Sequence, residues 1–553
     1  MNSDLFKKFH TRFVDRLPGD LETQNFTRTV SGATHSFVLP TPVAAPALVG
    51  WSETLAKKLE WPKPEDSKAL SILSGNFIPE TFKPYAARYG GHQFGHWAGQ
   101  LGDGRAITIG ELDLEDPELG RSLFHLPPLR LPPHQLSSPY HSADLERTEE
   151  KAESFSTVDI QLKGAGATPY SRRADGRAVL RSSIREFLCS EAMYFLGVPT
   201  TRALSVIASG DPVTRDLFYD GNPKDEPGAI VARVSPSFLR FGSFEILAAE
   251  KEFTLLKKLA DTLIADHFPE LSLTDPDVYG KLLDEVSRRT AVMVAHWLRV
   301  GFVHGVMNTD NLSALGLTLD YGPFGFLEAF DPSWTPNTTD LPGRRYCFGR
   351  QPQIALWNLS ICQEALGAAL TEDASCLQSG IEIYHLEFEK SYRKMRAHKL
   401  GLEKDHGTRD LELFSTLDQL LQKAQADHCL FYRFLEELDP DLLSRSFLNP
   451  QGTKEALRQF LELYRKRLNQ EEQSPEKRID RMQKTNPSRI PRNWQLLELI
   501  RKLELDPSSE ALSIAMQFWR HPYQALTIEE SLRQISSTEH RNLPGASQLS
   551  CSS

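Results

Sequence analysis

The sequence predicts an α+β protein of two lobes, in which a strand-rich first lobe is followed by a helical second lobe. Short apolar segments with strand-like alternation, bounded by glycines, gather between residues 85 and 245. From residue 246 the apolar residues recur at helical spacing, and after about residue 353 one helical pattern follows another. With 553 residues the chain is too long for one ordinary core, so two lobes with extra helical extensions are expected.

The predicted domain boundaries follow changes in composition. Residues 1–84 are expected to form an N-terminal extension of mixed helix and loop, residues 85–245 the first lobe and residues 246–540 the second. Residues 541–553 should form a flexible tail that carries Cys551. Within the first lobe, residues 112–156 are acidic and rich in proline, which predicts a flexible surface insert rather than core.

Individual elements can be placed from periodicity and from turn residues. Helices are expected at 52–61, at 176–197, where an aspartate lies upstream and Gly197 can end the helix, and at 282–301. The last of these runs directly into the chain's most informative motif. Strands are expected on both sides of the insert and again before the helical lobe, at 105–112, 157–166, 201–209 and 228–235.

That motif, "HGVMNTDN", has the frame of the protein-kinase catalytic loop, H-R-D-x-x-x-x-N. Asn311 follows His304 by seven residues, as in kinases, but Val306 stands where the base should be. Nine residues after Asn311, Asp320 opens a "DYG" that resembles the metal-binding D-F-G. Asn311 and Asp320 offer hard oxygen ligands for Mg²⁺, and Asp310 adds a carboxylate immediately before Asn311.

A lysine and a glutamate upstream complete the kinase pattern. Lys163 ends a predicted strand, and Glu186 lies 23 residues later on the following helix. A strand lysine neutralises phosphate charge, and a helix glutamate keeps that lysine aimed. Glu191, on the same helix, is the competing partner. Taken alone, Asp320 could cap a turn and Lys163 could be a solvated cation, so the order of the four elements carries the prediction.

The dipeptide Asp-Gly occurs twice before Arg-Ala, at two places suited to phosphate. In the first, Gly102, Gly104 and Arg105 could offer backbone N–H groups and a guanidinium, although a tight hairpin turn explains them equally well. In the second, Asp175 and Gly176 precede a predicted helix N-terminus, which attracts anions. The alternative there is an ordinary N-cap.

Two further patterns carry charged or ligating side chains. Arg233 and Arg240 lie seven residues apart among small and aromatic residues, which predicts an anion partner that is either phosphate or a structural carboxylate. His92 and His96 are four residues apart, but no third ligand is evident and the neighbouring glycines disfavour a helix. A metal site at the two histidines is therefore not expected.

Five long stretches of this sequence resemble the selenoprotein O family, also called the YdiU-like or UPF0061 family. They are "YAARYGGHQFGHWAGQLGDGRA", "LKGAGATPYSRRADGRAVLRSSIREFL", "FVHGVMNTDN", "DYGPFGFLEAFDP" and "GRRYCFGRQP", which together span about residues 85–360. The resemblance implies a protein-kinase-like fold, once regarded as a pseudokinase. Its members bind ATP in an inverted orientation and transfer AMP to Ser, Thr or Tyr hydroxyls of proteins, releasing pyrophosphate.

The resemblance also implies a role for each matching residue. Asp310 would be the base, Asn311 and Asp320 would bind Mg²⁺ or Mn²⁺, and Glu186 would hold Lys163. ATP would be contacted by Gly102, Gly104, Arg105, Lys163, Asp175, Gly176, Arg233, Arg240 and Asp320. The insert at 112–156 is longer than the family pattern leads us to expect.

Three functions stay open, and the family resemblance implies the first of them. The first is a protein adenylyltransferase, in which the inverted nucleotide makes a base at position 306 unnecessary. The second is a protein or small-molecule kinase with a rearranged loop, and the third is a non-catalytic pseudokinase scaffold that binds nucleotide. The expected partners are proteins with accessible Ser, Thr or Tyr residues, and a monomer is expected.

Composition excludes several other classes. The net charge of −10 disfavours nucleic acid as a partner, and no apolar run is long enough to span a membrane. The N-terminal segment lacks the apolar core of a signal peptide, so a cytoplasmic location is expected, with mitochondria as the alternative for a eukaryotic source.

The six cysteines form no CxxC pair, which excludes a disulfide scaffold and a zinc site. Cys551 is third from the end, where animal members of the resembled family carry selenocysteine. Cys347 lies 27 residues after Asp320, in a segment that resembles an activation loop. A reversible disulfide between Cys551 and Cys347 is therefore a possible switch, and an inert exposed thiol at Cys551 is the alternative.

Overall fold

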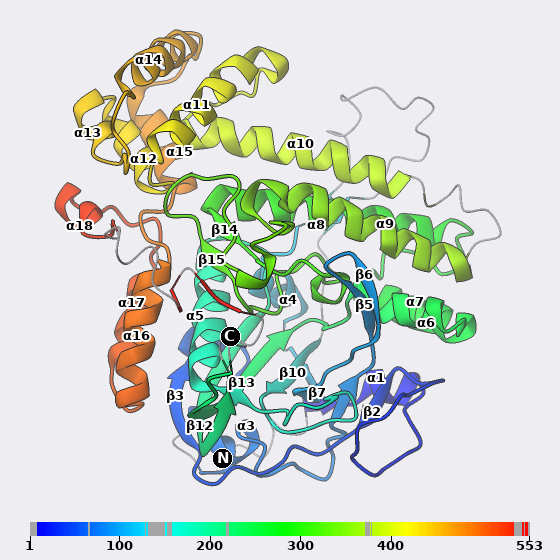
Figure 1. Ribbon diagram of the computed structural model, residues 1–553. Helices are drawn as coiled ribbons and strands as arrows, with labels where there is room; N and C mark the ends of the chain where they lie inside the picture. The colour runs from blue at the N-terminus through cyan, green and yellow to red at the C-terminus, as the bar shows by residue number, and fades with distance from the viewer. Residues whose placement is uncertain are drawn as a thin grey trace.

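The computed structural model describes residues 8–64, 67–114, 116–127, 129–130, 150–151, 157–216, 221–370, 377, 379–535, 545–546 and 548–550. These residues form a mixed α/β structure built on one large antiparallel sheet. In Figure 1 the sheet occupies the lower half of the molecule and most of the later helices lie above it.

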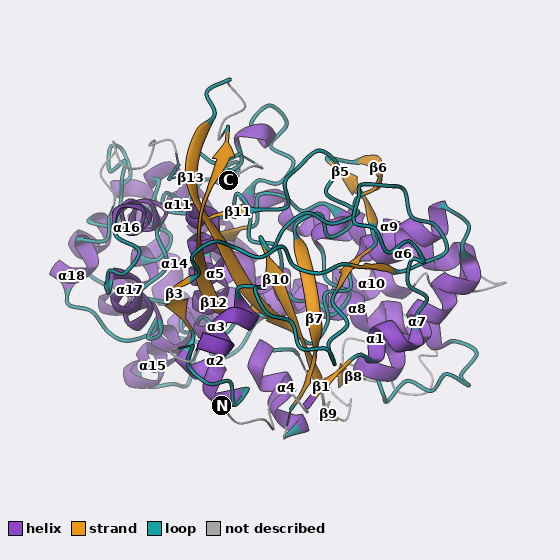
Figure 2. Cartoon of the chain, turned by 90° about the horizontal axis from the view of Figure 1, so that it is seen from below, coloured by secondary structure: helices purple, strands orange, loops and turns teal. Residues whose placement is uncertain are grey.

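The sheet has nine strands within the described residues. Its central order is β2 (His35–Phe37), β4 (Tyr85–Ala87), β7 (Ala106–Asp113), β10 (Thr157–Lys163), β13 (Lys224–Ser235), β12 (Arg202–Arg215) and β3 (Ala47–Trp51). Two short strands lie off this path, since β1 (Phe9–His10) pairs with β7 and β11 (Ala178–Val179) pairs with β13. Figure 2 shows β7, β10, β13 and β12 side by side.

The register of the central strands places two functional candidates. Lys163, the last residue of β10, lies between Ala106 of β7 and Val231 of β13. Arg233 of β13 lies opposite Gln161 of β10. Side chains two residues apart on a strand share a face, so the lysine and the arginine are brought to the same part of the sheet.

The helix α5 (Leu180–Phe195) packs on β12 and β13, as its predicted apolar face requires. Ile184 and Phe187 are fully buried beneath the sheet. Gly197 follows the end of the helix with φ of +71°, a backbone conformation that glycine adopts without a steric penalty. The strands predicted at 105–112, 157–166, 201–209 and 228–235 are all present as β7, β10, β12 and β13.

The N-terminal region differs from its prediction. The expected helix is present as α2 (Glu53–Lys58), together with α1 (Arg12–Arg16) and α3 (Ser67–Leu73), but β1, β2 and β3 also join the sheet. The described part of residues 1–84 therefore contributes three strands to the sheet. Their strands are only two to five residues long, so sequence alternation could not reveal them.

The insert also differs at its beginning. Residues 112–113 belong to β7, and α4 (Pro117–Phe124) follows with the side chains of Leu123 and Phe124 fully buried. A small ladder of β8 (Leu129–Arg130) and β9 (Glu150–Lys151) comes next. The rest of the segment expected to be flexible lies outside the described residues.

The helical region begins with α6 (Phe241–Ala249), α7 (Phe253–His267), α8 (Val278–Val300), α9 (Gln351–Leu370) and α10 (Ser379–Lys399). These helices share one hydrophobic core with the sheet. A second core lies farther out, among α11 (Leu411–Ala424), α12 (Leu430–Phe434), α13 (Pro440–Ser444), α14 (Lys454–Leu468) and α15 (Pro475–Thr485). Figure 1 shows these helices at the top, away from the sheet.

The last helices return toward the sheet. Both α16 (Asn493–Leu505) and α17 (Ala511–Trp519) contact α5, and α17 also contacts β3, whereas α18 (Ile528–Leu532) follows them. The predicted division at residue 246 is therefore crossed by the C-terminal part of the chain. No helix in the described part of the chain is long and apolar enough to cross a membrane.

Candidate active site

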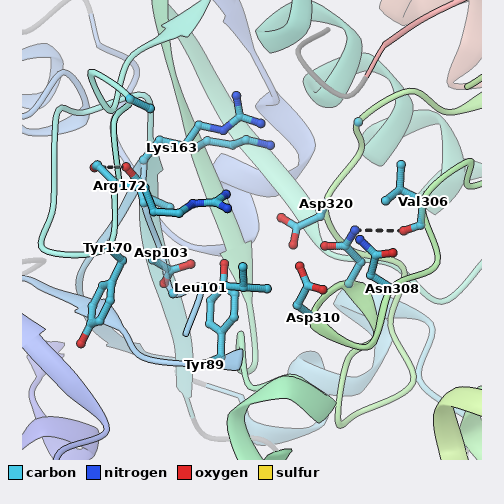
Figure 3. Close-up of a pocket in the computed structure, with 18 of the residues that line it drawn as sticks. Tyr89, Leu101, Asp103, Lys163, Tyr170, Arg172, Val306, Asn308, Asp310 and Asp320 are labelled. Atoms are coloured by element: carbon cyan, nitrogen blue, oxygen red, sulfur yellow. Dashed lines mark hydrogen bonds between the residues drawn. The ribbon is translucent and has the colours of Figure 1, made fainter. Parts of the chain in front are cut away.

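A cavity of about 690 Å³ lies between the sheet loops and the segment after α8. Figure 3 shows Lys163 and Arg172 on one side of it and Asp310 and Asp320 on the other. The candidate site residues that line the cavity are Gly102, Gly104, Arg105, Lys163, Gly176, Arg233, Arg240, Asp310, Asn311 and Asp320. Of the nucleotide-binding candidates, only Asp175 is missing from the lining.

The motif that resembles a catalytic loop is held between two short strands, β14 (Phe302–Val303) and β15 (Gly325–Phe326), which pair with each other. His304 is buried within it, and the backbone N–H of Val306 donates to its Nδ1 at 3.4 Å. That bond leaves the proton on Nε2, which donates to the carbonyl of Leu319 at 3.0 Å. The histidine thus connects the loop to the segment that precedes Asp320.

Asp310 and Asn311 lie in a short 3₁₀ turn, Thr309–Asn311, at the cavity wall. Burial raises the pKa of Asp310 to about 7, against the opposing effect of Arg240. Gln93 donates to Asp310 Oδ2 at 3.4 Å. The Asn311 amide nitrogen donates to the carbonyl of Val306 at 2.9 Å, which fixes the side chain and leaves its oxygen available.

The carboxylate of Asp320 accepts hydrogen bonds from two arginines. Nη1 of Arg233 donates to Asp320 Oδ1 at 2.6 Å, and Nη1 of Arg240 donates to Oδ2. Burial alone would raise the pKa of Asp320, but Arg240, Arg233 and Lys163 together hold it well below its usual range. The carboxylate therefore stays ionised. The backbone of Asp320 adopts a left-handed conformation, with φ of +59°.

The lysine and glutamate identified from sequence order are in contact. Lys163 Nζ lies 2.5 Å from Glu186 Oε2, and Arg233 reaches the other oxygen of Glu186 at 3.2 Å. The competing residue, Glu191, is occupied elsewhere: Arg202 binds both of its oxygens, at 2.6 and 2.7 Å. The structure therefore brings Glu186, and not Glu191, to Lys163.

The glycines on the sheet side are required by packing between two loops. A side chain at Gly102 would overlap the ring of Tyr170, because its Cβ would lie 2.4 Å from that ring. A Cβ at Gly176 would lie 2.1 Å from the carbonyl oxygen of Gly166. The N–H of Gly104 donates to the carbonyl of Gly102 at 2.9 Å, so it is engaged within the loop. Close approach of the two loops thus explains these glycines without a ligand.

Asp175 is not the helix N-cap that the sequence offered as one of its two roles. The α5 helix begins five residues later, at Leu180, and its N-cap is Val179, so Asp175 is not the cap. Its carboxylate instead binds Arg215 at 2.7 and 2.9 Å. The strand β11 lies between Asp175 and the helix and separates the two, which sequence spacing could not show.

The cavity also contains residues that the sequence did not single out. Arg172, with φ of +56°, and the predicted Arg105 line it without an ion-pair partner among the described residues. Asn308 and Gln93 line it as well. In the sequence, the segment "GHQFGHW" is conspicuous only for its two histidines as potential metal ligands. His92 in fact pairs with Glu245 at 2.7 Å, and the described residues contain no metal-binding cluster of His, Cys, Asp and Glu.

The two redox candidates are only partly visible. Cys347 is buried, and burial raises the pKa of its thiol. Cys551 lies outside the described residues. Near it in sequence, Leu549 is fully buried and pairs with the segment of Asn337, through bonds to the carbonyl of Pro336 and the N–H of Thr338. Leu549 therefore docks at Asn337, ten residues before Cys347 in the sequence.

Comparison with known proteins supports one family. A family model described as protein adenylyltransferase SelO matches residues 21–122 and 146–518, which leaves out most of the insert. Relatives named protein nucleotidyltransferase YdiU match over almost their whole length. The relative from Nitrosospira multiformis is 46% identical over 100% of this chain and 97% of its own. The relatives from Azoarcus sp. and Rhodopirellula baltica are 45% and 43% identical, each over 99% of both chains.

These matches cover the sheet, the cavity and the helices that return to the sheet. The aligned identity is far above the level at which only the fold would be shared, and it extends over both sides of the cavity. The chain therefore belongs to the SelO family of protein adenylyltransferases.

Proposed function

We propose that this protein transfers AMP from ATP to the hydroxyl of a Ser, Thr or Tyr residue in another protein. The observation that carries the proposal is a cavity with a buried carboxylate, Asp310, on one side and the cations Lys163 and Arg172 on the other. A hydroxyl acceptor needs a base and a triphosphate needs cations, and one cavity offers both.

The cations favour a nucleotide that enters in the inverted orientation. Arg105, Lys163, Arg177 and Arg215 line the cavity from the sheet side, whereas Arg240 donates to the backbone carbonyl of Asp310. A β- and γ-phosphate held against this wall leaves the α-phosphorus facing Asp310. Val306 then needs no carboxylate, because the γ-phosphorus is no longer the reacting centre.

The proposed chemistry is one in-line displacement. Asp310 accepts the proton of the acceptor hydroxyl, whose oxygen forms a bond to the α-phosphorus. The bond between the α-phosphorus and the oxygen bridging to the β-phosphorus breaks, and pyrophosphate leaves with that electron pair. Lys163, held by Glu186, and the guanidinium of Arg233 stabilise the charge that develops on the leaving group.

The residues present fit a divalent cation such as Mg²⁺ or Mn²⁺. Asn311 offers its amide oxygen and Asp320 an ionised carboxylate, and both residues line the cavity. Hard divalent cations prefer such oxygen ligands. When bound, the cation would neutralise phosphate charge. Asp320 would supply a ligand oxygen to such a cation, and in this structure its two oxygens accept from Arg233 and Arg240.

The kinase-like fold is part of the same proposal. It is supported by the ion pair between a strand lysine and a helix glutamate, and by the loop and the carboxylate that follow α8.

A redox switch through Cys347 and Cys551 is also proposed. A peroxide would take two electrons and two protons from the thiols, forming a disulfide and water. Docking of the tail near Asn337 favours it, and the burial of Cys347 requires that segment to open.

Labelled ATP tests the proposal directly. Purified protein is incubated with Mg²⁺ and with ATP labelled at the α- or the γ-phosphate, using its own chain and dephosphorylated casein as acceptors. We expect protein-bound label from the α position only, and its loss in Asp310→Asn but not in the control Asp331→Asn, which lies outside the cavity lining. Label from the γ position alone would establish a kinase, and no label with either would favour the scaffold.

A further inference from the structure

A β-hairpin covers the turn that carries Asp310. Its strands are β5 (Gly90–Gln93) and β6 (His96–Gln100), and Gln93 pairs with His96 across the turn. The two turn residues, Phe94 and Gly95, have φ of +51° and +87°, the conformation of a type I′ turn. Phenylalanine rarely adopts positive φ, so other contacts must hold the tip of the hairpin in place.

Successive hairpin residues contact the three residues that end at Asp310. The backbone N–H of His92 donates to Thr309 Oγ1 at 2.8 Å. The Gln93 side-chain amide donates to Asp310 Oδ2 at 3.4 Å. The backbone N–H of Phe94 donates to Asn308 Oδ1 at 3.2 Å. Each of these three hairpin residues thus holds one residue of the turn: His92 holds Thr309, Gln93 holds Asp310, and Phe94 holds Asn308.

The second oxygen of Asp310 packs against the same hairpin. A Cβ at Gly91 would lie 2.7 Å from Asp310 Oδ1 and 2.9 Å from its Cβ, so only glycine fits there. Oδ1 is buried and has no hydrogen-bond partner among the described residues. Gly91 therefore closes one side of the carboxylate, while Gln93 is its only side-chain donor from this hairpin.

The hairpin is anchored on both flanks. Tyr346 donates its hydroxyl proton to Asn308 Oδ1 at 2.6 Å, and the N–H of Phe94 points to the same hydroxyl at 3.0 Å. On the other flank, His92 Nδ1 lies 2.7 Å from Glu245 Oε2. A hairpin held in this way can impose one orientation on a side chain beneath it.

We propose that Gln93 is a positioning residue, which together with Gly91 sets the orientation of the Asp310 carboxylate toward the acceptor hydroxyl. The inference rests on the proposed transfer of AMP by this site. The amide is suited to the task because it donates a hydrogen bond without adding charge beside a carboxylate. A misplacement of a reacting group by about 1 Å can cost about 100-fold in rate.

Three variants test this assignment. Gln93→Leu removes the donor, Gln93→Glu keeps the shape but replaces the donor with an acceptor, and His96→Ala is the control. His96 is exposed and pairs with Gln93 across the hairpin, so its removal perturbs the same turn without touching Asp310. Transfer of the α-label is measured under steady-state conditions, and affinity for a non-hydrolysable ATP analogue is measured by calorimetry.

We expect kcat to fall about 10- to 100-fold in Gln93→Leu and further in Gln93→Glu, with KM for ATP and analogue affinity unchanged. His96→Ala should match the wild type. A packing role would be preserved by the isosteric glutamate, so wild-type kcat in Gln93→Glu would overturn the inference. Equal falls in kcat and in analogue affinity would overturn it too, by showing a collapsed site.

The outcome for the wild type separates this inference from the proposed function. If the wild type transfers no α-label to casein or to itself, the proposed function fails and the role of Gln93 falls with it. If the wild type transfers α-label and both Gln93 variants equal it, only the assignment of Gln93 fails. Melting temperatures near that of the wild type exclude unfolding as the cause of a loss.

Discussion

Two buried arginine–aspartate pairs lie in different regions of this molecule and have different surroundings. At the cavity, Asp320 is held by Arg240 and Arg233, whereas in the helical region Asp427 is held by Arg492 at 2.6 and 3.1 Å. Both Arg240 and Arg492 are buried. The side chain of Asp320, however, is 19% exposed, and that of Asp427 only 2%.

The second partners of the two aspartates show what each pair does. Asp427 also accepts the backbone N–H groups of Cys429 and Leu430, at 3.1 and 2.9 Å, so it fixes the start of α12. The carboxylate of Asp320 is instead satisfied by side-chain cations, and it lies with them at the wall of a cavity. Burial of an ion pair is thus not by itself evidence of function, whereas a charged pair that lines a cavity marks a candidate site.

The largest loss of AMP transfer is expected from a substitution at Asp320. Asp320→Asn keeps the shape but removes the charge, and we expect AMP transfer to fall about 10²- to 10³-fold. Stability should fall as well, because a carboxyl whose pKa is held well below its usual range stabilises the fold when it is ionised. Transfer of the α-label and the melting temperature are the measurements. Full activity in this variant would remove the cavity pair from the site.

A loss of stability alone is expected at the distant pair. Arg492→Met leaves Asp427 charged and buried without its partner, which should lower the free energy of unfolding by about 3–5 kcal/mol. Transfer per folded molecule at low temperature should equal that of the wild type, since Arg492 lies outside the cavity lining. Urea denaturation measures the loss.

A double variant sharpens this second prediction. Asp427→Asn combined with Arg492→Met removes both charges, so it should recover part of the lost stability relative to Arg492→Met alone. If Arg492→Met instead lost transfer activity at unchanged stability, the distinction between the two pairs would not hold.

The same contrast exists within α5, on two glutamates five residues apart. Glu186→Gln weakens the hold on Lys163 and Arg233, so we expect transfer to fall about 100-fold through misplacement of the lysine. Glu191→Gln weakens the bonds to Arg202 and Ser52, which should cost about 1–3 kcal/mol of stability and little activity. The reverse result would make Glu191 the functional residue.

The sequence could predict much of this contrast between Glu186 and Glu191, because it depends on the order and spacing of residues along the chain. The helix at 176–197, the strand that ends at Lys163 and the motif before Asp320 each have a periodicity or a fixed spacing that needs no tertiary information. That order also ranked Glu186 above Glu191, and the structure places Glu186 at Lys163.

Other parts depend on partners that lie far apart in the chain. The short strands β1 to β3 form only because β7, β4 and β12 supply hydrogen bonds from distant positions. The separation of Asp175 from the start of α5 depends on β11 pairing with β13. Gln93 was missed because its importance lies in contact with a turn more than two hundred residues away. Its only local sign is the glycine-rich hairpin around it.

A buried lysine that has no carboxylate partner among the described residues extends the comparison. Lys399 in α10 is buried, donates to the carbonyl of Arg299 at 2.8 Å and lies 3.9 Å from the centre of the Tyr432 ring. Burial lowers the pKa of Lys399 to about 7; the nearby Cys429 opposes this shift, and Arg299 and Arg396 add to it. Its charge is thus less well compensated than that of Lys163, which has Glu186.

This difference predicts a pH dependence of stability. An unfolded lysine has a pKa near 10.4, so between about pH 7 and pH 10 the unfolded chain binds a proton that the folded chain has released. Raising the pH through that window should therefore increase the free energy of unfolding, by about 1 kcal/mol per pH unit. Urea denaturation at pH 7 and pH 9 should show this slope in the wild type and in the control Lys466→Met, which is exposed on α14. Lys399→Met should lack it, and an equal slope in Lys399→Met would show that the carbonyl and the ring compensate the charge as well as a carboxylate does.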